Sequence, residues 1–267
     1  MECEVVNVEV KRGEKIYIEP LGDIHYGHPA CDLKRLRSRV NAIRDDPHRY
    51  WIGMGDYIEN IRPYRPGRVD MRWNTEILKG EPDWDLQIRG IVEELKPIAH
   101  KCFGLLWGNH EWANMTGMEF EDRLCNPLGA KFLGSSAFIL MRILCDKKLV
   151  GEYVIFATHG NYSGSKVGGA INRMQDLSSV YDADIYLMGH VHTKAIHRDE
   201  KISVGVVRGK PVVMKRTVIY GLTGCFLNSY QKGVETYVDR KPMLRNFKMG
   251  TITIGIDPWE GKLHGYD

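Results

Sequence analysis

Five short segments of this chain place aspartate, asparagine or histidine next to a glycine, in a fixed order. They are Gly22-Asp23-Ile24-His25, Gly55-Asp56-Tyr57-Ile58-Glu59, Gly108-Asn109-His110-Glu111, Thr158-His159-Gly160 and Gly189-His190-Val191-His192. Carboxylate, amide and imidazole groups are the ligands that hard and borderline divalent cations take in proteins. The segments supply seven such groups and one further histidine, which is enough for a site that holds two metal ions.

These side chains need rigid supports, and the sequence places them where strands end. Four of the five segments follow an apolar run, and residues 15–20 alternate as a strand does before the first segment. A glycine neighbour lets the backbone turn sharply and approach a cation closely. Asp23 and His25 are two residues apart, as are His190 and His192, so in an extended backbone each pair would share one face.

The order of the remaining elements predicts an α/β fold. Residues 33–44 and 85–95 carry apolar side chains at helical spacing, and a further helix is expected to start near Val167. Strand patterns alternate with these helices and then dominate, over 1–11, 50–54, 102–107, 153–157, 184–188, 202–207, 211–220 and 249–256. This pattern favours a sandwich of two mixed β-sheets flanked by helices, with the whole chain, 1–267, as a single domain.

Composition sets further limits. The 267 residues are 43% hydrophobic, enough for a sizeable core, and the net charge of +3 permits an anionic substrate without requiring one. No run of about 18 apolar residues predicts a membrane span, and the N-terminus lacks the apolar core of a signal peptide. The six cysteines form no CxxC pair, so we expect reduced thiols, a cytoplasmic location and no cysteine zinc site.

Taken together, the five segments resemble the motifs of the calcineurin-like binuclear metallophosphoesterases, over about residues 16–225. The resemblance implies a four-layer α-β-β-α sandwich. It implies that one metal would be held by Asp23, His25, Asp56 and His192, and the second by Asp56, Asn109, His159 and His190. His110 would be the catalytic histidine that binds no metal, and Glu59 stands where the family often has an aspartate that orients this histidine.

The chemistry implied is metal-dependent hydrolysis of a phosphate ester. Two cations would activate a hydroxide that attacks phosphorus, and His110 would protonate the leaving group. Nitrogen and oxygen ligands suit manganese, iron, zinc, nickel or cobalt. Resemblance to the family's DNA-processing members favours manganese.

Basic and aromatic residues between the motifs suggest a nucleic-acid substrate. Arginine side chains would bind its phosphates, and aromatic rings would stack on its bases. The candidates for substrate binding are Arg62, Arg65, Arg68, Arg72, Lys166, Arg173 and Tyr230. A solvated basic loop would give the same pattern. The overall arrangement is similar to metallophosphoesterases of phages and prophages, several of which act on DNA, so the expected activity is that of a nuclease or DNA phosphodiesterase.

Other activities stay open. Protein Ser/Thr phosphatases of this superfamily carry an arginine directly after the acidic residue of the second motif, where it can clamp a terminal phosphate, and this chain has Asn60 there. A phosphomonoesterase acting on nucleotides or small phosphorylated metabolites is the main alternative. A non-catalytic scaffold on the same fold is a further one, although scaffold relatives lose ligands or the catalytic histidine and this chain keeps them all.

Overall fold

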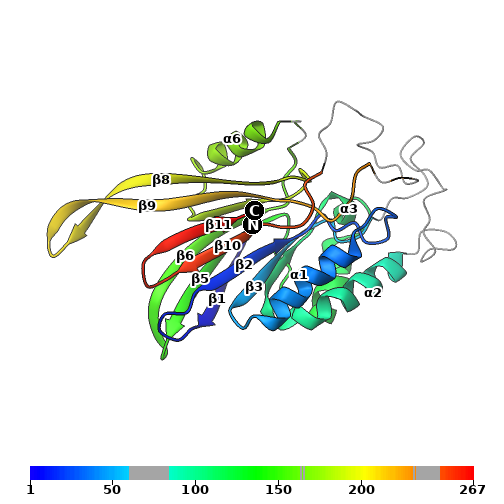
Figure 1. The fold of residues 1–267 in the computed structure, drawn as a ribbon, viewed down its shortest axis with the longest axis horizontal. Helices are drawn as coiled ribbons and strands as arrows, with labels where there is room; N and C mark the ends of the chain where they lie inside the picture. Colours follow the sequence, from blue (N-terminus) through cyan, green and yellow to red (C-terminus); the bar gives the residue numbers. More distant parts are fainter. Residues whose placement is uncertain (60–83, 163, 165, 231, 233–246) are drawn as a thin grey trace.

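Two mixed β-sheets lie face to face in the computed structural model, which describes residues 1–59, 84–162, 164, 166–230, 232 and 247–267 (Figure 1). Within these residues, one sheet has six strands in the order β1 (Glu2–Glu9), β5 (Ser136–Cys145), β6 (Lys148–Thr158), β7 (Ile185–Met188), β9 (Lys210–Thr223) and β8 (Lys194–Val207). The other has five, in the order β11 (Lys262–Tyr266), β10 (Thr253–Asp257), β2 (Ile16–Leu21), β3 (Arg49–Met54) and β4 (Cys102–Leu106).

The main core fills the space between the two sheets. Strand β5 shows why these residues form it, since Ala137, Ile139, Met141 and Ile143 are buried at every second position. They meet aliphatic side chains of the facing sheet, such as those of Ile16, Ile18, Ile52, Ile254 and Ile256. Alternation of this kind buries one face of each strand and fixes its register.

Helices cover the two outer faces (Figure 1). Helices α1 (Leu33–Asp45) and α2 (Trp84–Leu95) pack on the five-stranded sheet, where Leu36 and Ile91 share a buried cluster with Trp51 of β3. Helix α6 (Val167–Leu177) packs on the six-stranded sheet, where Ala170 and Met174 contact the cluster around Tyr186. The predicted fold class, an α-β-β-α sandwich, is therefore confirmed.

Short helices complete the described elements: the first of them joins α2 to β4, and the other four lie between β4 and β5. They are η3 (Lys96–Lys101), α3 (Asn109–Trp112), α4 (Gly117–Phe120), η4 (Glu121–Cys125) and α5 (Asn126–Leu128). Of these, α3 carries the third motif and begins at its asparagine.

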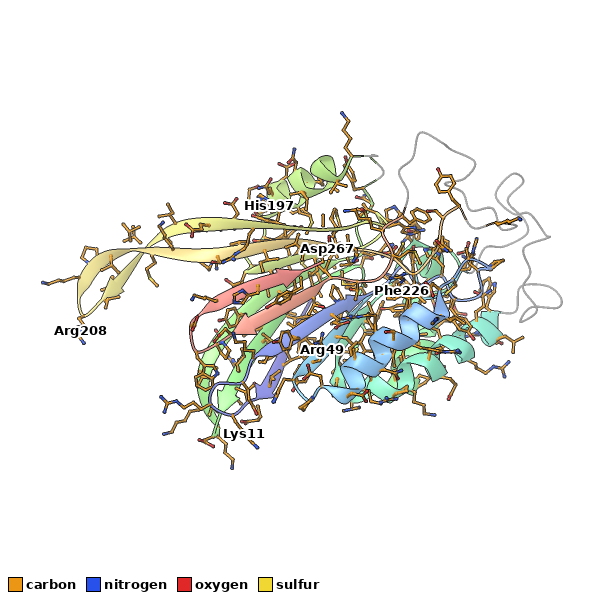
Figure 2. All side chains as sticks on the ribbon, in the orientation of Figure 1. Lys11, Arg49, His197, Arg208, Phe226 and Asp267 are labelled. Atoms are coloured by element: carbon orange, nitrogen blue, oxygen red, sulfur yellow. The ribbon has the colours of Figure 1, made fainter. Side chains whose placement is uncertain are left out.

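Most elements lie within a few residues of their predicted places, and the exceptions have physical reasons. Strand β5 escapes the sequence pattern because apolar residues such as Phe138 and Leu140 also occupy its outer face, so no polar alternation marks it. Strand β11 is short and largely exposed, and only its pairing with β10 defines it. Strands β8 and β9 are longer than predicted and form a hairpin that projects from the body, with Arg208 at its tip (Figure 2).

None of the helices in the described part of the chain is long and apolar enough to cross a membrane. The six cysteines are free thiols.

Candidate metal centre

Most of the predicted ligands lie just beyond the ends of strands, at residues whose backbone is in the left-handed conformation. Nine described residues other than glycine have positive φ, and five of them are predicted ligands: Asp23 (48°), His25 (54°), Asp56 (52°), His190 (65°) and His192 (48°). Such backbone is costly for these residue types and gathers at functional sites. The expectation that each pair shares a face of an extended strand is wrong, because the residues lie past their strands and the turns themselves bring the side chains together.

Two glycines allow the second and third motifs to touch. A Cβ atom on Gly108 would lie 2.1 Å from Oδ1 of Asp56, and one on Gly55, whose φ is +89°, would lie 2.5 Å from the backbone nitrogen of Gly108. No larger residue fits at either position without moving the backbone. The close approach brings Asp56 beside the start of α3.

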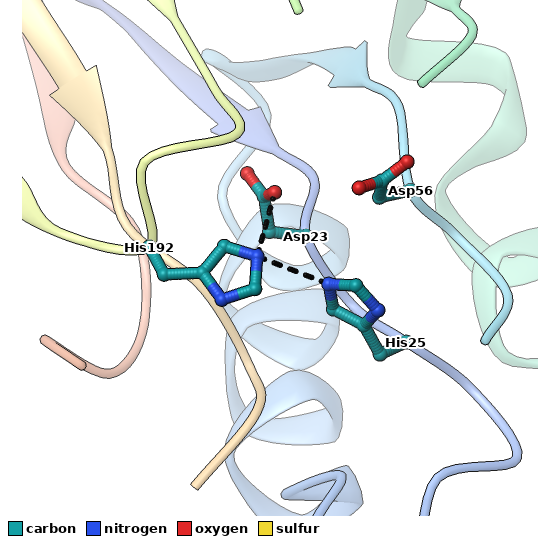
Figure 3. Close-up of side chains that lie close together, drawn as sticks. All are labelled: Asp23, His25, Asp56 and His192. Carbon is teal, nitrogen blue, oxygen red and sulfur yellow. Dashed lines mark hydrogen bonds and ion pairs between the residues drawn. The ribbon is translucent and has the colours of Figure 1, made fainter. Parts of the chain in front are cut away.

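One group of potential ligands comprises Asp23, His25, Asp56 and His192, all of them buried (Figure 3). Their ligand atoms lie within 4.8 Å of one another. Nε2 of His192 lies 3.1 Å from Oδ1 of Asp23 and 3.1 Å from Nε2 of His25. This is the set that the family resemblance implies for one metal.

A second group shares Asp56 with the first. It contains Asp56, His159 and His190, again with ligand atoms within 4.8 Å. Nε2 of His159 lies 3.4 Å from Oδ2 of Asp56 and 3.1 Å from Oδ1 of Asn109. The structure therefore brings all seven predicted ligands to one place, with Asp56 between the two groups.

Backbone amides hold both aspartates. The amide of His190 donates to Oδ2 of Asp23 at 2.9 Å, and the amide of His110 donates to Oδ1 of Asp56 at 2.9 Å. The other oxygen of each carboxylate faces the histidines. Oδ1 of Asp23 is buried and receives no hydrogen bond from the described residues, although Nε2 of His192 lies 3.1 Å away, so it is an acceptor aimed into the centre.

Three imidazole rings are oriented through Nδ1. The Nδ1 atom of His159 lies 2.7 Å from the carbonyl oxygen of Met54, and that of His25 lies 2.8 Å from Oε2 of Glu59. The Nδ1 atom of His110 lies 2.5 Å from the main-chain oxygen of Glu59. Bonds of this kind place the proton on Nδ1 and leave Nε2 to face the centre, which is how metal-binding histidines are commonly held.

Glu59 thus positions two histidines, but differently from the expectation. Its carboxylate bonds to His25, and His110 is held by its main-chain carbonyl oxygen. The side-chain role that the resemblance suggests toward His110 is taken here by the backbone.

The electrostatics of the centre call for positive charge. Asp23 and Asp56 are 0% and 1% exposed. Burial would raise the pKa of Asp56, but the charges of His159 and His110 lower it well below its usual value. Burial would lower the pKa of both His159 and His110. The charges of Asp56 and Asp23 instead raise the pKa of His159 to about 10. Those of Asp56 and Glu59 raise the pKa of His110 to about 9.

The donor set fits a pair of divalent cations. Two buried carboxylates, an amide oxygen and imidazole nitrogens match the ligands of such ions. The inward-facing Nε2 atoms of His25 and His192 and the Oδ1 atom of Asp23 form a cradle that a cation would satisfy. We infer that metal ions would take the place of the protons that otherwise offset these carboxylates.

Glu111, the last residue of the third motif, has a structural role that the sequence pattern does not reveal. Its buried carboxylate accepts backbone N–H groups through both oxygens: Oε2 from Asp56 (2.9 Å) and Gly108 (2.8 Å), and Oε1 from Tyr57 (2.7 Å) and Ile58 (3.3 Å). Burial, followed by the charge of Asp56, raises the pKa of Glu111 to about 7 against the effect of these amides. The signal in the sequence was an acidic residue in the first turn of a short helix, and its partners are visible only in the fold.

Three of the seven predicted substrate-binding residues lie in the part of the chain that the structure describes. Lys166 precedes α6 and Arg173 lies on it, both exposed, and Tyr230 is 52% exposed. Arg62, Arg65, Arg68 and Arg72, together with Asn60, lie outside the residues that the structure describes. Their role in substrate binding stays a prediction.

Comparison with known proteins identifies the class of this chain. The pattern of the calcineurin-like phosphoesterase family matches residues 21–194, more than half of the chain. The chain therefore belongs to the calcineurin-like phosphoesterase family, whose members bind two divalent metals. No curated protein matches the chain significantly.

Several solved structures are similar to this chain at low sequence identity. A predicted phosphoesterase from Streptococcus pneumoniae is 11% identical with a TM-score of 0.39, over 91% of this chain and 84% of that one. A Vps29 single mutant from Entamoeba histolytica is 14% identical with a TM-score of 0.44, over 94% and 97% of the chains. Vacuolar protein sorting 29 from Cryptosporidium parvum is 15% identical with a TM-score of 0.42, over 94% and 95%.

The shared position of Asp56 predicts how metal binding responds to substitution. We expect wild type to bind two Mn²⁺ ions per chain, His190→Ala to retain one, and Asp56→Ala to lose affinity at both places. Metal content after Mn²⁺ loading and desalting measures this. At a free concentration of 100 times the dissociation constant, each bound Mn²⁺ should stabilise the protein by about 2.7 kcal/mol in thermal melts. Asp182→Ala, an exposed site, is the control, and two ions retained by Asp56→Ala would contradict the assignment.

Glu111→Gln should destabilise the protein severely. In glutamine, an NH₂ group replaces one of the two carboxylate oxygens. Because this group cannot accept a hydrogen bond, the two backbone N–H groups facing it would be unsatisfied, and each unsatisfied donor costs about 1–3 kcal/mol. We expect the free energy of unfolding to fall by about 2–6 kcal/mol in urea titrations. The matched control is Glu119→Gln in the exposed capping box of α4, where glutamine can still accept from the amide of Thr116 and a loss of about 0.5 kcal/mol or less is expected. Equal losses in the two variants would rule out the role given to Glu111.

Proposed function

We propose that this protein hydrolyses phosphodiester bonds with two divalent cations, and that its substrate is DNA. The observation that supports the hydrolytic part best is the convergence of His25, His159 and His110, each oriented through Nδ1, around the shared carboxylate of Asp56. A buried carboxylate between two groups of imidazoles is suited to a pair of cations. Manganese is the ion that we propose, on the resemblance to DNA-processing relatives.

The chain's own residues would divide the work as follows. Bound cations would supply an activated water and neutralise charge on the phosphoryl oxygens. Asp23 and Asp56, each fixed by a backbone amide, hold their free oxygens in place before any ligand arrives, so little reorganisation is needed. His110, 20% exposed in its side chain, turns Nε2 away from Glu59 and toward the centre, where it can donate a proton to the leaving oxygen.

The proposal of DNA rests on the sequence between the motifs. Four arginines with interspersed aromatic rings follow the second motif, and such segments suit a phosphate backbone and unstacked bases. Asn60, in place of the arginine of the protein phosphatases, supports a diester over a phosphoprotein. The similarity to phage and prophage enzymes points the same way by family analogy.

Paired assays test the reaction class. With Mn²⁺, turnover of bis-nitrophenyl phosphate should exceed that of nitrophenyl phosphate, because the proposed site is built for a diester. Digestion of single-stranded, double-stranded and circular DNA under the same metal then tests the substrate. Strong preference for the monoester would favour a phosphomonoesterase, and diester turnover with every DNA left intact would remove DNA as the substrate.

Replacing His110 should affect poor leaving groups most. A positioned general acid contributes about 100- to 10,000-fold, and a nitrophenolate needs little of that help. We expect His110→Ala to lose activity toward a thymidine dinucleotide by such a factor and to lose far less toward bis-nitrophenyl phosphate, measured as kcat. The exposed His100→Ala serves as the control. Equal losses on both substrates would refute the general-acid role.

A further inference from the structure

The β8–β9 hairpin extends well beyond the body of the protein (Figure 1). Both strands have 14 residues, yet β9 pairs with β7 only over Ile219–Leu222. We call residues 202–214 the distal ribbon. In this segment the two strands pair with each other and lie beyond the last paired residue of β7, out to Arg208 at the tip (Figure 2).

One face of the distal ribbon is apolar and exposed. Ile202, Val204, Val206 and Val213 are exposed by 68%, 76%, 73% and 71%. The register places Val204 opposite Val213 and Val206 opposite Pro211, without an irregularity along the hairpin. Because side chains alternate along a strand, these residues share a face.

This face continues the interior of the sandwich. Ile219, on the same side of β9 as Val213 by alternation, is buried in the core between the two sheets, and Ile196 on β8 packs against that core. In the body, the five-stranded sheet covers the face. Beyond the core, Arg198, Glu200 and Lys215 interrupt the apolar pattern on this face. The pattern resumes on the distal ribbon from Ile202 onward, where the apolar side chains are exposed, and an exposed apolar face is typical of a surface that meets a partner.

The charges of the distal ribbon favour a protein partner over a nucleic acid. Within residues 202–214 the charged side chains are Arg208 at the turn and Lys210 at the first position of β9, and the other residues of the segment, which Lys201 and Lys215 flank, carry none. Binding to a phosphate backbone needs cationic side chains along the contact. Uncharged, β-branched strands instead suit a dry contact with a similar surface.

We propose that the distal ribbon is a dimerisation arm, which packs this apolar face against the same face of a second copy of the chain. The run Ile202–Val206 has Val204 at its middle, so a two-fold axis there gives a self-complementary contact. The two ribbons run antiparallel. A parallel arrangement would force the two bodies together, because the five-stranded sheet of each lies on the side of the packed face.

The antiparallel arrangement also pairs charges. Arg208 and Glu200 lie four residues to either side of Val204, so the tip of each ribbon reaches Glu200 of the other copy. Glu200 is exposed and lies 3.4 Å from Lys215 of its own chain, where it can accept a second cation. A standard interface uses about 20–30 residues a side, and the ribbon supplies about half of that, so the dimer should dissociate reversibly at micromolar concentrations.

Sedimentation velocity over a range of about 1–100 µM tests the proposal on the full chain. Wild type should shift from monomer to dimer, and Val204→Lys should raise the dimer dissociation constant at least about thirtyfold, because two like charges would meet at the axis. Val5→Lys, at an exposed valine on β1 at the opposite edge of the same sheet, should leave dimerisation unchanged. Thermal melts of both variants check that each is folded.

A charge exchange tests the register. Arg208→Glu alone should weaken the dimer by placing two carboxylates together, and the double variant Glu200→Arg/Arg208→Glu should restore it. A wild type that stays monomeric throughout, or a dimer that Val204→Lys leaves intact, would overturn the proposal. So would a monomeric wild type that loses binding to labelled DNA on the substitution Arg208→Glu, since the ribbon would then be a nucleic-acid arm.

Discussion

The metal centre depends on one buried carboxylate that binds no metal in our assignment. Glu111 accepts four backbone N–H groups, three from the loop after β3 and one from the residue before α3. The loop after β3 carries Asp56, and α3 carries Asn109 and His110, so the bonds set the distance between the shared carboxylate and the proposed catalytic histidine. Such loops present donors that the sheet cannot satisfy, and leaving them buried and unpaired would be costly. Glu111 accepts hydrogen bonds from these donors, and the same bonds fix the geometry of the site.

The centre also needs both sheets. Asp23, Asp56 and Asn109 follow strands of the five-stranded sheet, and His159 and His190 follow strands of the six-stranded one. The amide of His190 bonds to Asp23, and Nδ1 of His159 bonds to the carbonyl oxygen of Met54, so hydrogen bonds join the two sheets at the centre. The aliphatic core between the sheets therefore does more than stabilise the fold, because it determines whether the two halves of the site meet.

The sequence predicted much of this, for reasons that differ by feature. Apolar runs ending in Gly-Asp or Gly-His located the strand ends, because burial and turning are local properties. The sequence did not predict the contacts of Glu111 and Glu59. The bond from Asp56 to Glu111 spans 55 residues, and the bonds of Glu59 to His25 and His110 span 34 and 51 residues. Which atom of Glu59 points inward is also decided only by the fold. The left-handed turns at Asp23 and His25 were likewise hidden, because nothing in their residue types requires positive φ and only surrounding contacts hold it.

Glu59 divides its contacts between two histidines. Its carboxylate reaches Nδ1 of His25, whereas the resemblance of the motifs implies an acidic side chain here that orients the proposed catalytic histidine. In this chain that histidine, His110, is left to a main-chain carbonyl, which orients the ring but carries no full negative charge. A neutral acceptor stabilises the imidazolium form less than a carboxylate does. Burial would lower the pKa of His110, but the charges of Asp56 and Glu59 nevertheless raise it to about 9, so the ring is protonated near neutral pH, as the proposed general acid requires.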